Sequence, residues 1–304
     1  MFNKYNRLLT NHTYFQYCFF ILLIISVVLN FMFQDDSNVY ILYIVSVIFL
    51  GIGFYNQPAW FLIFFTALVV ACRFFLIPDA TATGVTFLFY FFTYFIITII
   101  SVWLMKNVQK VREDNIELTK VLANALDSRD SYTLHHSENV AKYAVKIAKK
   151  KKLSKNLCNI IHIGALLHDI GKIGIPEHIL TKPGKLTNDE YHFIKTHPTI
   201  GYEIIKHVAS FSENGVLDIV LYHHERFDGK GYPKGLKGKQ IPLVARIIAV
   251  ADTFDAMTSK RVYRDELDLD YTLNEIRKNK GTQFDPDIVD VFLGLFEHEK
   301  ANIK

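Results

Sequence analysis

Histidine and aspartate side chains recur at the ends of short apolar segments in the C-terminal two thirds of this 304-residue sequence. Adjacent His-Asp and His-His pairs are informative, because neighbouring side chains on a helix diverge by about 100° and reach different metals or different faces of one metal. Seven residues of the types that ligate metal ions stand out: His136, His168, Asp169, His197, His223, His224 and Asp252. The pattern predicts metal-assisted chemistry at one shared site.

The number of ligands limits the kind of metal centre. Seven nitrogen and oxygen ligands exceed what one tetrahedral zinc ion uses, and they suit two octahedral ions with positions left for water and substrate. Imidazole and carboxylate ligands leave iron, manganese, zinc and nickel open. A single helical histidine is more often an ordinary core or surface group, and this interpretation is given to His12, His135, His162, His178, His192, His207 and His298.

Charge is distributed unevenly along the chain. Residues 1–105 contain three basic and three acidic side chains, whereas the rest of the chain contains 31 and 27. The net charge of +4 is therefore carried by the C-terminal part, where it is too mild and dispersed to indicate a nucleic acid polymer as partner. The three cysteines are far apart and form no CxxC pair, which argues against a disulfide framework or a thiolate metal site.

The uncharged N-terminal part predicts a membrane domain over residues 1–105. Its apolar stretches at 13–33, 39–55, 59–77 and 83–105 are each close to the about 20 residues that cross a bilayer as a helix. Basic residues flank the first and last stretches on the same side, which predicts four spans with both ends in the cytoplasm. We expect a multi-pass protein of the inner (cytoplasmic) membrane that contacts lipid. Arg73 near a span end is expected to snorkel, with an intramembrane functional charge as the alternative.

Residues 106–126 predict a helical connector. Apolar residues recur in an a/d pattern with one polar position, as expected for a short parallel coiled coil, at Leu104, Val108, Val111, Asn115, Leu118, Leu122 and Ala125. This seam predicts a homodimer. The alternative is one amphipathic helix that packs on its own domain. The basic run at 149–152 has two interpretations as well, a solvated helix end or contact with an anionic leaflet or substrate.

Residues 127–304 predict an all-helical domain, so that the whole chain is all-α. Apolar residues recur at spacings of three and four, and strand-like alternation is absent from the sequence. Gly- and Pro-rich stretches at 171–184, 229–242 and 281–286 are expected to separate the helices.

The segment from about 120 to 300 resembles the HD-GYP family, a helical subgroup of the HD phosphohydrolase superfamily. The stretches that carry the resemblance are "YTLHHSENV", "HDIGKIGIP", "ILTKPGKLTNDE", "KTHPTIGYEII", "HHERFDGKGYPKGL", "IPLVARIIAVADTFDAMTS" and "RVYR". The resemblance implies hydrolysis of cyclic di-GMP to linear pGpG, GMP or both, at a centre of two divalent metals that is commonly di-iron, with manganese as the alternative. The family's metal ligands fall on the same seven residues.

The resemblance also implies roles for individual side chains. Lys172 matches the family's phosphate-contacting lysine, and Tyr232, Arg261 and Arg264 match its substrate-binding residues. Asp169 is expected to bridge the two metals. Gly231 and Pro233 are equally compatible with an ordinary tight turn. Two other functions stay open: a receptor that holds the dinucleotide without cleaving it, and a phosphodiesterase for another cyclic dinucleotide.

Two positions depart from the family pattern. Some members carry a glutamate four residues before the first histidine ligand, where it allows a third metal, and this sequence has Tyr132 there. His135 stands where glycine is usual. Neither change touches the seven expected ligands.

Overall fold

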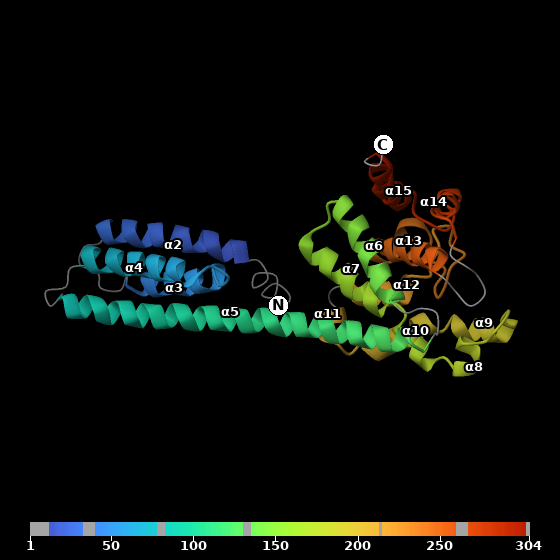
Figure 1. Ribbon diagram of the computed structural model, residues 1–304, viewed down its shortest axis with the longest axis horizontal. Coiled ribbons are helices and arrows are strands. Elements are labelled where there is room, and N and C mark those ends of the chain that lie inside the picture. Colours follow the sequence, from blue (N-terminus) through green and yellow to red (C-terminus); the bar gives the residue numbers. More distant parts are fainter. Residues whose placement is uncertain are drawn as a thin grey trace. The chain divides into compact units, whose positions relative to one another are not determined.

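The computed structural model describes residues 12–32, 40–77, 83–129, 135–212, 215–259 and 267–301 (Figure 1). Over these ranges the regular structure is helical, apart from one isolated bridge between Lys280 and Phe284. This confirms the predicted all-α class. The chain divides into two compact units, Met1–Asp114 and Asn115–Lys304.

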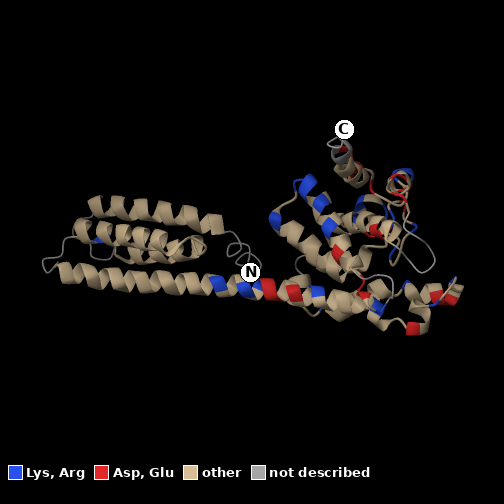
Figure 2. Cartoon of the chain, in the orientation of Figure 1, with Lys and Arg blue, Asp and Glu red and all other residues tan. Residues whose placement is uncertain are grey.

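The N-terminal unit consists of apolar helices that coincide with the four predicted apolar stretches. They are α2 (His12–Met32), α3 (Tyr40–Gly53), α4 (Ala59–Leu76) and the first part of α5 (Gly84–Asp127). Figure 2 shows these helices almost free of charged residues. Among the described residues, α2, α4 and α5 are long and apolar enough to cross a bilayer, whereas α3 has 14 residues.

Several polar side chains inside the N-terminal unit pair with one another. The amide of Asn30 on α2 donates to the hydroxyl of Tyr43 on α3 at 2.7 Å, and the hydroxyls of Thr66 and Thr98 lie 3.2 Å apart between α4 and α5. Gly51 lets α3 approach α5 closely, because a Cβ atom at this position would lie 2.5 Å from the Ser101 side chain. Such pairing is what an apolar environment requires of buried polar groups.

Arg73 is placed over aromatic rings. Its guanidinium lies 3.6 Å from the ring centroid of Tyr90 on α5, and 5.7 Å and 5.6 Å from those of Tyr40 and Tyr94. Attraction between the cation and the negative ring faces stabilises this arrangement. The expected snorkelling stays a prediction, and the contacts show in addition that Arg73 ties α4 to its neighbours.

The C-terminal unit packs its helices around one main apolar core. The core draws on α6, α7, α13 and α15, with residues such as Ile147, Ile161, Ile248 and Phe292 fully buried. The elements after α5 are α6 (His136–Lys150), α7 (Lys155–Leu167), η2 (Ile170–Gly174), α8 (Glu177–Leu180), α9 (Asn188–Ile194), α10 (His197–Ile205), α11 (Ala209–Ser212), α12 (Val216–Tyr222), η3 (Gly238–Gln240), α13 (Leu243–Thr258), α14 (Leu269–Lys278) and α15 (Pro286–Ala301).

Two of the predicted breaks contain short helical turns. The stretch 171–184 includes most of η2 and all of α8, and the stretch 229–242 includes η3. Turns of three to five residues bury too little to leave a periodic pattern in the sequence, so pattern reasoning assigns them to loops. Helix starts leave a clearer local signal: Thr187 and Glu190 form a capping box at α9.

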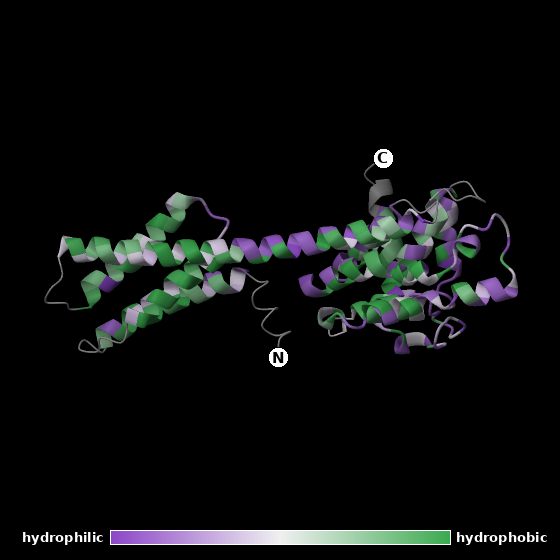
Figure 3. Cartoon of the chain, turned by 90° about the horizontal axis from the view of Figure 1, so that it is seen from below, coloured by the Kyte–Doolittle hydropathy of each residue, from purple (hydrophilic) through white to green (hydrophobic). Residues whose placement is uncertain are grey.

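Helix α5 joins the apolar and polar parts of the chain without a break. It runs over 44 residues, and Figure 3 shows its hydrophobic part followed by a strongly hydrophilic stretch. Near its C-terminal end Ala123 and Leu126 are buried in the C-terminal unit, whereas Leu118 and Leu122 of the predicted seam are 62% and 58% exposed. These two seam residues therefore do not pack on their own domain in this chain.

Candidate metal centre

The seven predicted ligands come together from five separate segments of the chain, with His168 and Asp169 sharing the junction of α7 and η2. His136 begins α6, His168 ends α7 and Asp169 precedes η2, His197 begins α10, His223 and His224 follow α12, and Asp252 lies in α13. Their donor atoms form two groups that share Asp169: one with His197, His223 and His224, the other with His136 and His168. Asp252 joins the second group, since its Oδ1 lies 3.3 Å from Nε2 of His136.

Backbone carbonyls fix the tautomers of three of these rings. Nδ1 of His168 lies 2.7 Å from the carbonyl of Ala165, and Nδ1 of His197 lies 2.8 Å from that of Ile194. Nδ1 of His223 faces the carbonyl of Val220 at 2.9 Å. A carbonyl oxygen only accepts, so each Nδ1 carries the proton and donates it. In each neutral ring Nε2 is then a bare lone pair.

Those lone pairs point at one another. Nε2 of His197 lies 3.2 Å from Nε2 of His223 and 3.2 Å from Oδ1 of Asp169, and imidazole rings in their neutral form have no proton to place between these atoms. Nε2 of His168 is fully buried and makes no hydrogen bond to the described residues. Acceptors crowded in this way repel one another unless a cation lies between them. These residues therefore fit divalent metal ions.

His136 is held by a carboxylate that the sequence pattern did not single out. Its Nδ1 donates to Oδ2 of Asp255 at 2.7 Å, and Asp255 is buried. Burial of His136 opposes its charged form, but hydrogen bonds to Asp252 and Asp255 outweigh burial and raise its pKa to about 10. The same carboxylates favour a metal cation at Nε2, where it competes with the proton.

Asp169 and Lys172 form an ion pair at the centre. Nζ of Lys172 lies 2.6 Å from Oδ2 of Asp169, and Oδ1 of the same carboxylate faces His197. Burial would raise the pKa of Asp169, but the ammonium group of Lys172 holds it well below its usual range. The carboxylate is thus ionised and presents its two oxygens to different neighbours, which is the arrangement a bridging ligand needs.

Burial also keeps the paired histidines neutral. It lowers the pKa of His223 well below its ordinary value and that of His224 to about 3, and neighbouring histidines act in the same direction. Neutral imidazole is the form that ligates metals. Burial of Asp252 is outweighed by its hydrogen bond to His136, which lowers the pKa of Asp252.

The segment after the paired histidines folds back on them. The ring of Tyr232 lies 4.8 Å from that of His224, and its backbone N–H donates to the carbonyl of His224 at 3.3 Å. Gly231 approaches the chain so closely that a Cβ atom would lie 2.3 Å from the nitrogen of Arg226. Gly231 is thus required by close backbone packing, and Tyr232 borders the metal centre.

Glu225 fixes this segment through backbone hydrogen bonds. It is buried, and its two carboxylate oxygens accept from the backbone N–H groups of Lys234 at 2.7 Å and Leu236 at 3.0 Å. The sequence gives one indication of this role, since Glu225 is an acidic residue directly after two predicted ligands. The motifs did not predict it. Asp255 had a comparable signal, since it lies three residues after Asp252 and so on the same helix face.

Three residues singled out in the sequence lie outside the described part of the chain: Arg261, Arg264 and Tyr132. Their expected roles stay predictions. His135 is described and adopts a left-handed conformation with φ of 68°. Glycine is the residue that this conformation favours, which explains in physical terms why a glycine suits this position.

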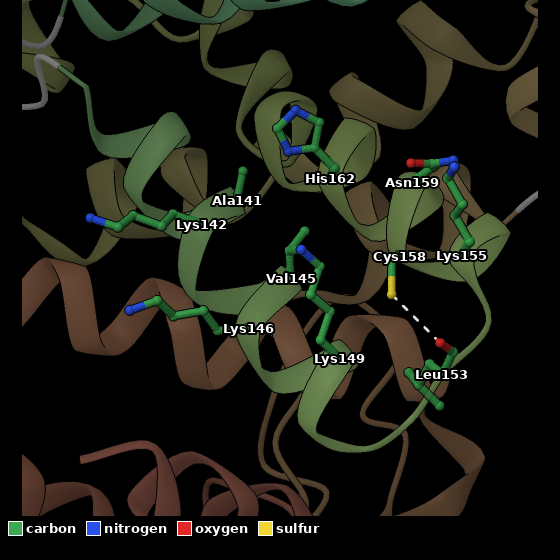
Figure 4. Close-up of a pocket in the computed structure, with 10 residues that line it drawn as sticks. All are labelled: Ala141, Lys142, Val145, Lys146, Lys149, Leu153, Lys155, Cys158, Asn159 and His162. Carbon is green, nitrogen blue, oxygen red and sulfur yellow. Dashed lines mark hydrogen bonds between the residues drawn. The ribbon is translucent and has the colours of Figure 1, made fainter. Parts of the chain in front are cut away.

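A hollow lies on α6 and α7, away from the candidate metal centre (Figure 4). Its volume is about 740 Å³, its lining includes the apolar Val145, Leu153 and Cys158, and lysines such as Lys149 and Lys155 surround them. Seven lysines and no acidic residue occur between Glu138 and Asp169. We call this hollow the lysine groove; none of the seven predicted ligands lines it.

Comparison with known proteins assigns the class. The HD domain pattern matches residues 120–288, which is more than half of the chain, and the chain belongs to the HD domain family. Its relatives bear out the HD-GYP resemblance. One is the cyclic di-GMP phosphodiesterase response regulator RpfG of Xanthomonas campestris pv. campestris (strain 8004), 44% identical over 191 residues, which are 62% of this chain and 50% of the relative.

Two further relatives differ in the substrate that their names give. A cyclic di-GMP phosphodiesterase of Thermotoga maritima is 42% identical over 179 residues, 59% of this chain and 49% of the relative. The 3'3'-cGAMP-specific phosphodiesterase 2 of Vibrio cholerae serotype O1 is 37% identical over 183 residues, 60% and 35% of the two chains. The chain spans about half the length, or less, of these relatives.

Proposed function

We propose that the chain is a membrane-anchored phosphodiesterase that hydrolyses cyclic di-GMP to linear pGpG, GMP or both at a dinuclear metal centre. The observation that carries the proposal is the shared position of Asp169 between two groups of ligand atoms. Buried acceptors without protons support metal occupancy on both sides of this carboxylate. Iron is the proposed metal, with manganese as the alternative, because both accept imidazole and carboxylate ligands.

In this proposal each side chain has a separate role in metal binding or in substrate binding. Two ions held by the seven ligands would supply a water of lowered pKa and neutralise charge on the phosphate. Asp169 bridges the two sides, and Asp255 orients His136 by accepting its Nδ1 proton. Lys172 places a cation beside the phosphoryl oxygens, where negative charge develops. Tyr232, Arg261 and Arg264 bind the nucleotide, since a guanidinium fork suits a phosphate or a guanine edge.

The direct test is a substrate comparison with the full chain in detergent. The protein is loaded anaerobically with iron or manganese and given cyclic di-GMP, 3'3'-cGAMP and cyclic di-AMP, and products are separated by chromatography. Hydrolysis of cyclic di-GMP with the highest kcat/KM supports the proposal. Binding of cyclic di-GMP without turnover in the fully loaded protein would establish the receptor function instead.

Hydrolysis of 3'3'-cGAMP is the second candidate function. It is favoured by the relatives of Vibrio cholerae that are named for this substrate and share 37% identity with the chain. The same metal centre serves either dinucleotide, so a preference would reside in the groups that contact the bases. A higher kcat/KM for 3'3'-cGAMP in the same substrate comparison would decide for this candidate.

For the N-terminal unit we propose four membrane spans with both termini in the cytoplasm of the cell, at the inner membrane. The support is the length and apolar character of α2, α4 and α5, with α3 as a shorter apolar helix between them. A reporter that is active only in the cytoplasm, fused after Lys304, is expected to work. Activity only of an exported reporter would contradict the topology.

Two partners belong to the same proposal. A second copy of the chain would cover the exposed seam residues Leu118 and Leu122 on α5. Anionic lipid would suit the lysine groove, whose apolar and basic lining complements a lipid headgroup and its first methylenes. Cross-linking through a cysteine introduced at Leu118 tests the dimer, and binding to phosphatidylglycerol but not phosphatidylcholine vesicles tests the lipid contact.

A further inference from the structure

The C-terminal end of α5 contacts two segments that carry ligands of the candidate metal centre. Helix α5 begins in the apolar N-terminal unit and ends at Asp127 inside the C-terminal unit. Two charged side chains at this end, Asp127 and Arg129, reach different ligand-bearing segments. Neither belongs to the predicted ligands, and neither is explained by the proposed chemistry.

Asp127 holds the start of α6. Its Oδ2 accepts from the backbone N–H of Ser137 at 3.0 Å and its Oδ1 from the hydroxyl of Ser137 at 2.9 Å. Asp127 and Ser137 are both buried, so the two bonds are shielded from water. Ser137 directly follows His136 on the first turn of α6. A carboxylate that fixes the backbone N–H group beside His136 also fixes the position of the His136 ring in the candidate metal centre.

Arg129 holds the η2 turn on the other side. Its Nη1 donates to the carbonyl of Ile173 at 3.0 Å and, at 3.4 Å, to that of Lys172. Its Nη2 donates to the carbonyl of Ile175 at 3.3 Å and pairs with Glu177 at 3.0 Å. One planar fork thereby spans the turn that follows Asp169 and carries Lys172.

The end of α5 is anchored firmly enough to act on these segments. Ala123 belongs to the main apolar core and Leu126 is buried, and Asn124 donates to Glu138 on the first turn of α6 at 3.0 Å. A rotation or shift of α5 about its axis would therefore move the start of α6 and the η2 turn. His136 lies on the first segment and Asp169 borders the second, and they belong to one group of ligand atoms.

We propose that Asp127 and Arg129 are positioning residues that set the separation of His136 and Asp169 according to the state of α5. They form the point at which the N-terminal unit regulates the metal centre. The inference rests on the proposed function for its biological meaning, but the contacts predict effects on metal binding that can be measured without any substrate.

The test uses the full chain in detergent with Arg129→Ala as the main variant, because this side chain is 31% exposed and its removal leaves the core intact. Manganese(II) is the probe, and the EPR spectrum reports whether two ions are magnetically coupled. The variant is expected to bind manganese about 10–100-fold more weakly in the group that contains His136, with a weakened coupled signal. Arg129→Lys keeps the positive charge but lacks the planar fork of donors. Its manganese affinity is expected to lie between those of the wild type and Arg129→Ala.

Arg246→Ala is the matched control. Arg246 donates to the carbonyl of Ile241 at 2.9 Å and pairs with Asp285, so its loss also destabilises the unit. These partners lie on neither the first turn of α6 nor the η2 turn, and the manganese spectrum of this variant is expected to match the wild type. If Arg246→Ala weakens manganese coupling as much as Arg129→Ala does, the effect is general destabilisation and the positioning role is wrong.

A second experiment tests whether α5 acts through Arg129. Deletion of Lys110 rotates the remainder of the helix by about 100°, whereas deletion of residues 108–114 nearly preserves the helical phase. The two deletions are expected to differ at least about tenfold in manganese affinity, and this difference is expected to shrink at least about threefold when each is combined with Arg129→Ala. Equal differences in both backgrounds, or none in the wild type, would overturn the proposal. Failure of the proposed function would show differently, as absent turnover with normal coupling.

Discussion

Buried polar side chains are arranged differently in the two units of this chain. In the N-terminal unit buried hydroxyl and amide groups meet one another, as Asn30 meets Tyr43 and Thr66 meets Thr98. In the C-terminal unit His197 and His223 turn bare lone pairs toward each other and toward Asp169. The two pairs, Asn30 with Tyr43 and Thr66 with Thr98, are complete within the chain, whereas the arrangement of His197, His223 and Asp169 is stable only with a positive charge between the acceptors.

This difference separates structural polar groups from ligands better than burial does. Residues of both kinds are almost inaccessible, with Thr66 at 0% and His197 at 1% exposed. What distinguishes them is the number of available protons, because Nδ1 of His197 and Nδ1 of His223 each donate the single proton of a neutral ring to a backbone carbonyl. Substitution, removal of metal and acid each perturb either the paired polar groups of the N-terminal unit or the histidine cluster of the C-terminal unit. The expected effects decrease from substitution of Asp169 to substitution of the threonine pair.

Asp169→Ala is expected to reduce turnover by more than about 100-fold, since it removes the carboxylate that both ligand groups share. Far-UV circular dichroism is expected to stay close to that of the wild type, because the centre is assembled from helix ends. Asp290→Ala, on the exposed side of α15, serves as the matched control and is expected to keep full activity. Turnover of Asp169→Ala within a few-fold of the wild type would contradict the bridging role.

Removal of the metals by a chelator is expected to destabilise the C-terminal unit alone. Each ion present at about 1,000 times its dissociation constant contributes about 4 kcal/mol, so two ions contribute about 8 kcal/mol, which corresponds to a Tm shift of about 20 °C for a unit of this size. The two tryptophans, Trp60 and Trp103, both lie in the N-terminal unit. Circular dichroism is therefore expected to show the shift while tryptophan fluorescence shows none. A shift of equal size in both signals would contradict the comparison.

Acid is expected to destabilise the chelator-treated protein through His224. Its folded-state pKa of about 3 lies below the unfolded value of 6.5, so the unfolded chain takes up a proton between about pH 7 and 5 that the folded chain does not. The free energy of unfolding therefore falls as pH falls through 6.5. His136 has a raised pKa of about 10. Its contribution to the free energy of unfolding is complete below pH 6.5 and is lost as pH rises toward 10.

Between about pH 7 and 5 the free energy of unfolding is accordingly expected to fall by about 2 kcal/mol less in His224→Asn than in the wild type. Thermal unfolding in the presence of chelator at the two pH values measures this difference. His192→Asn, on the exposed surface of α9, is the control and is expected to behave as the wild type. Identical acid sensitivity of His224→Asn and the wild type would show that His224 is not held neutral by burial.

The smallest effect is expected for the double variant Thr66→Val, Thr98→Val. Replacement of both hydroxyls by methyl groups removes a satisfied pair and leaves no orphaned partner between the side chains, so the free energy of unfolding is expected to change by less than about 1 kcal/mol. Tryptophan fluorescence during thermal unfolding reports on this unit. A loss of several kcal/mol would show that the pair has a role beyond packing.

Much of the fold, and the gathering of the candidate ligands in one place, could be predicted from the sequence. The four apolar stretches coincide with α2 to α5, and the seven ligand types gather in one place because His-Asp and His-His pairs at helix ends leave a legible signal. The short elements η2, α8 and η3 escaped prediction, since a turn of a few residues has no period.

The supporting residues were also missed, for a physical reason. Asp255, Glu225 and Asp127 act through hydrogen bonds to groups that the fold brings close, such as the bond from His136 to Asp255 across 119 positions. Local patterns do not encode such distances. An acidic residue near a predicted ligand is only a weak indication, because most acidic residues lie at the surface.

Metal content tests the central claim most directly. Protein purified anaerobically and loaded with iron or manganese is subjected to elemental analysis beside an activity measurement. Two groups of ligand atoms that share Asp169 predict two ions per chain, and Tyr132 supplies no carboxylate for a third. Activity is expected to rise with occupancy and to level off at two ions. Full activity with one ion per chain, or three ions in the active protein, would contradict the account.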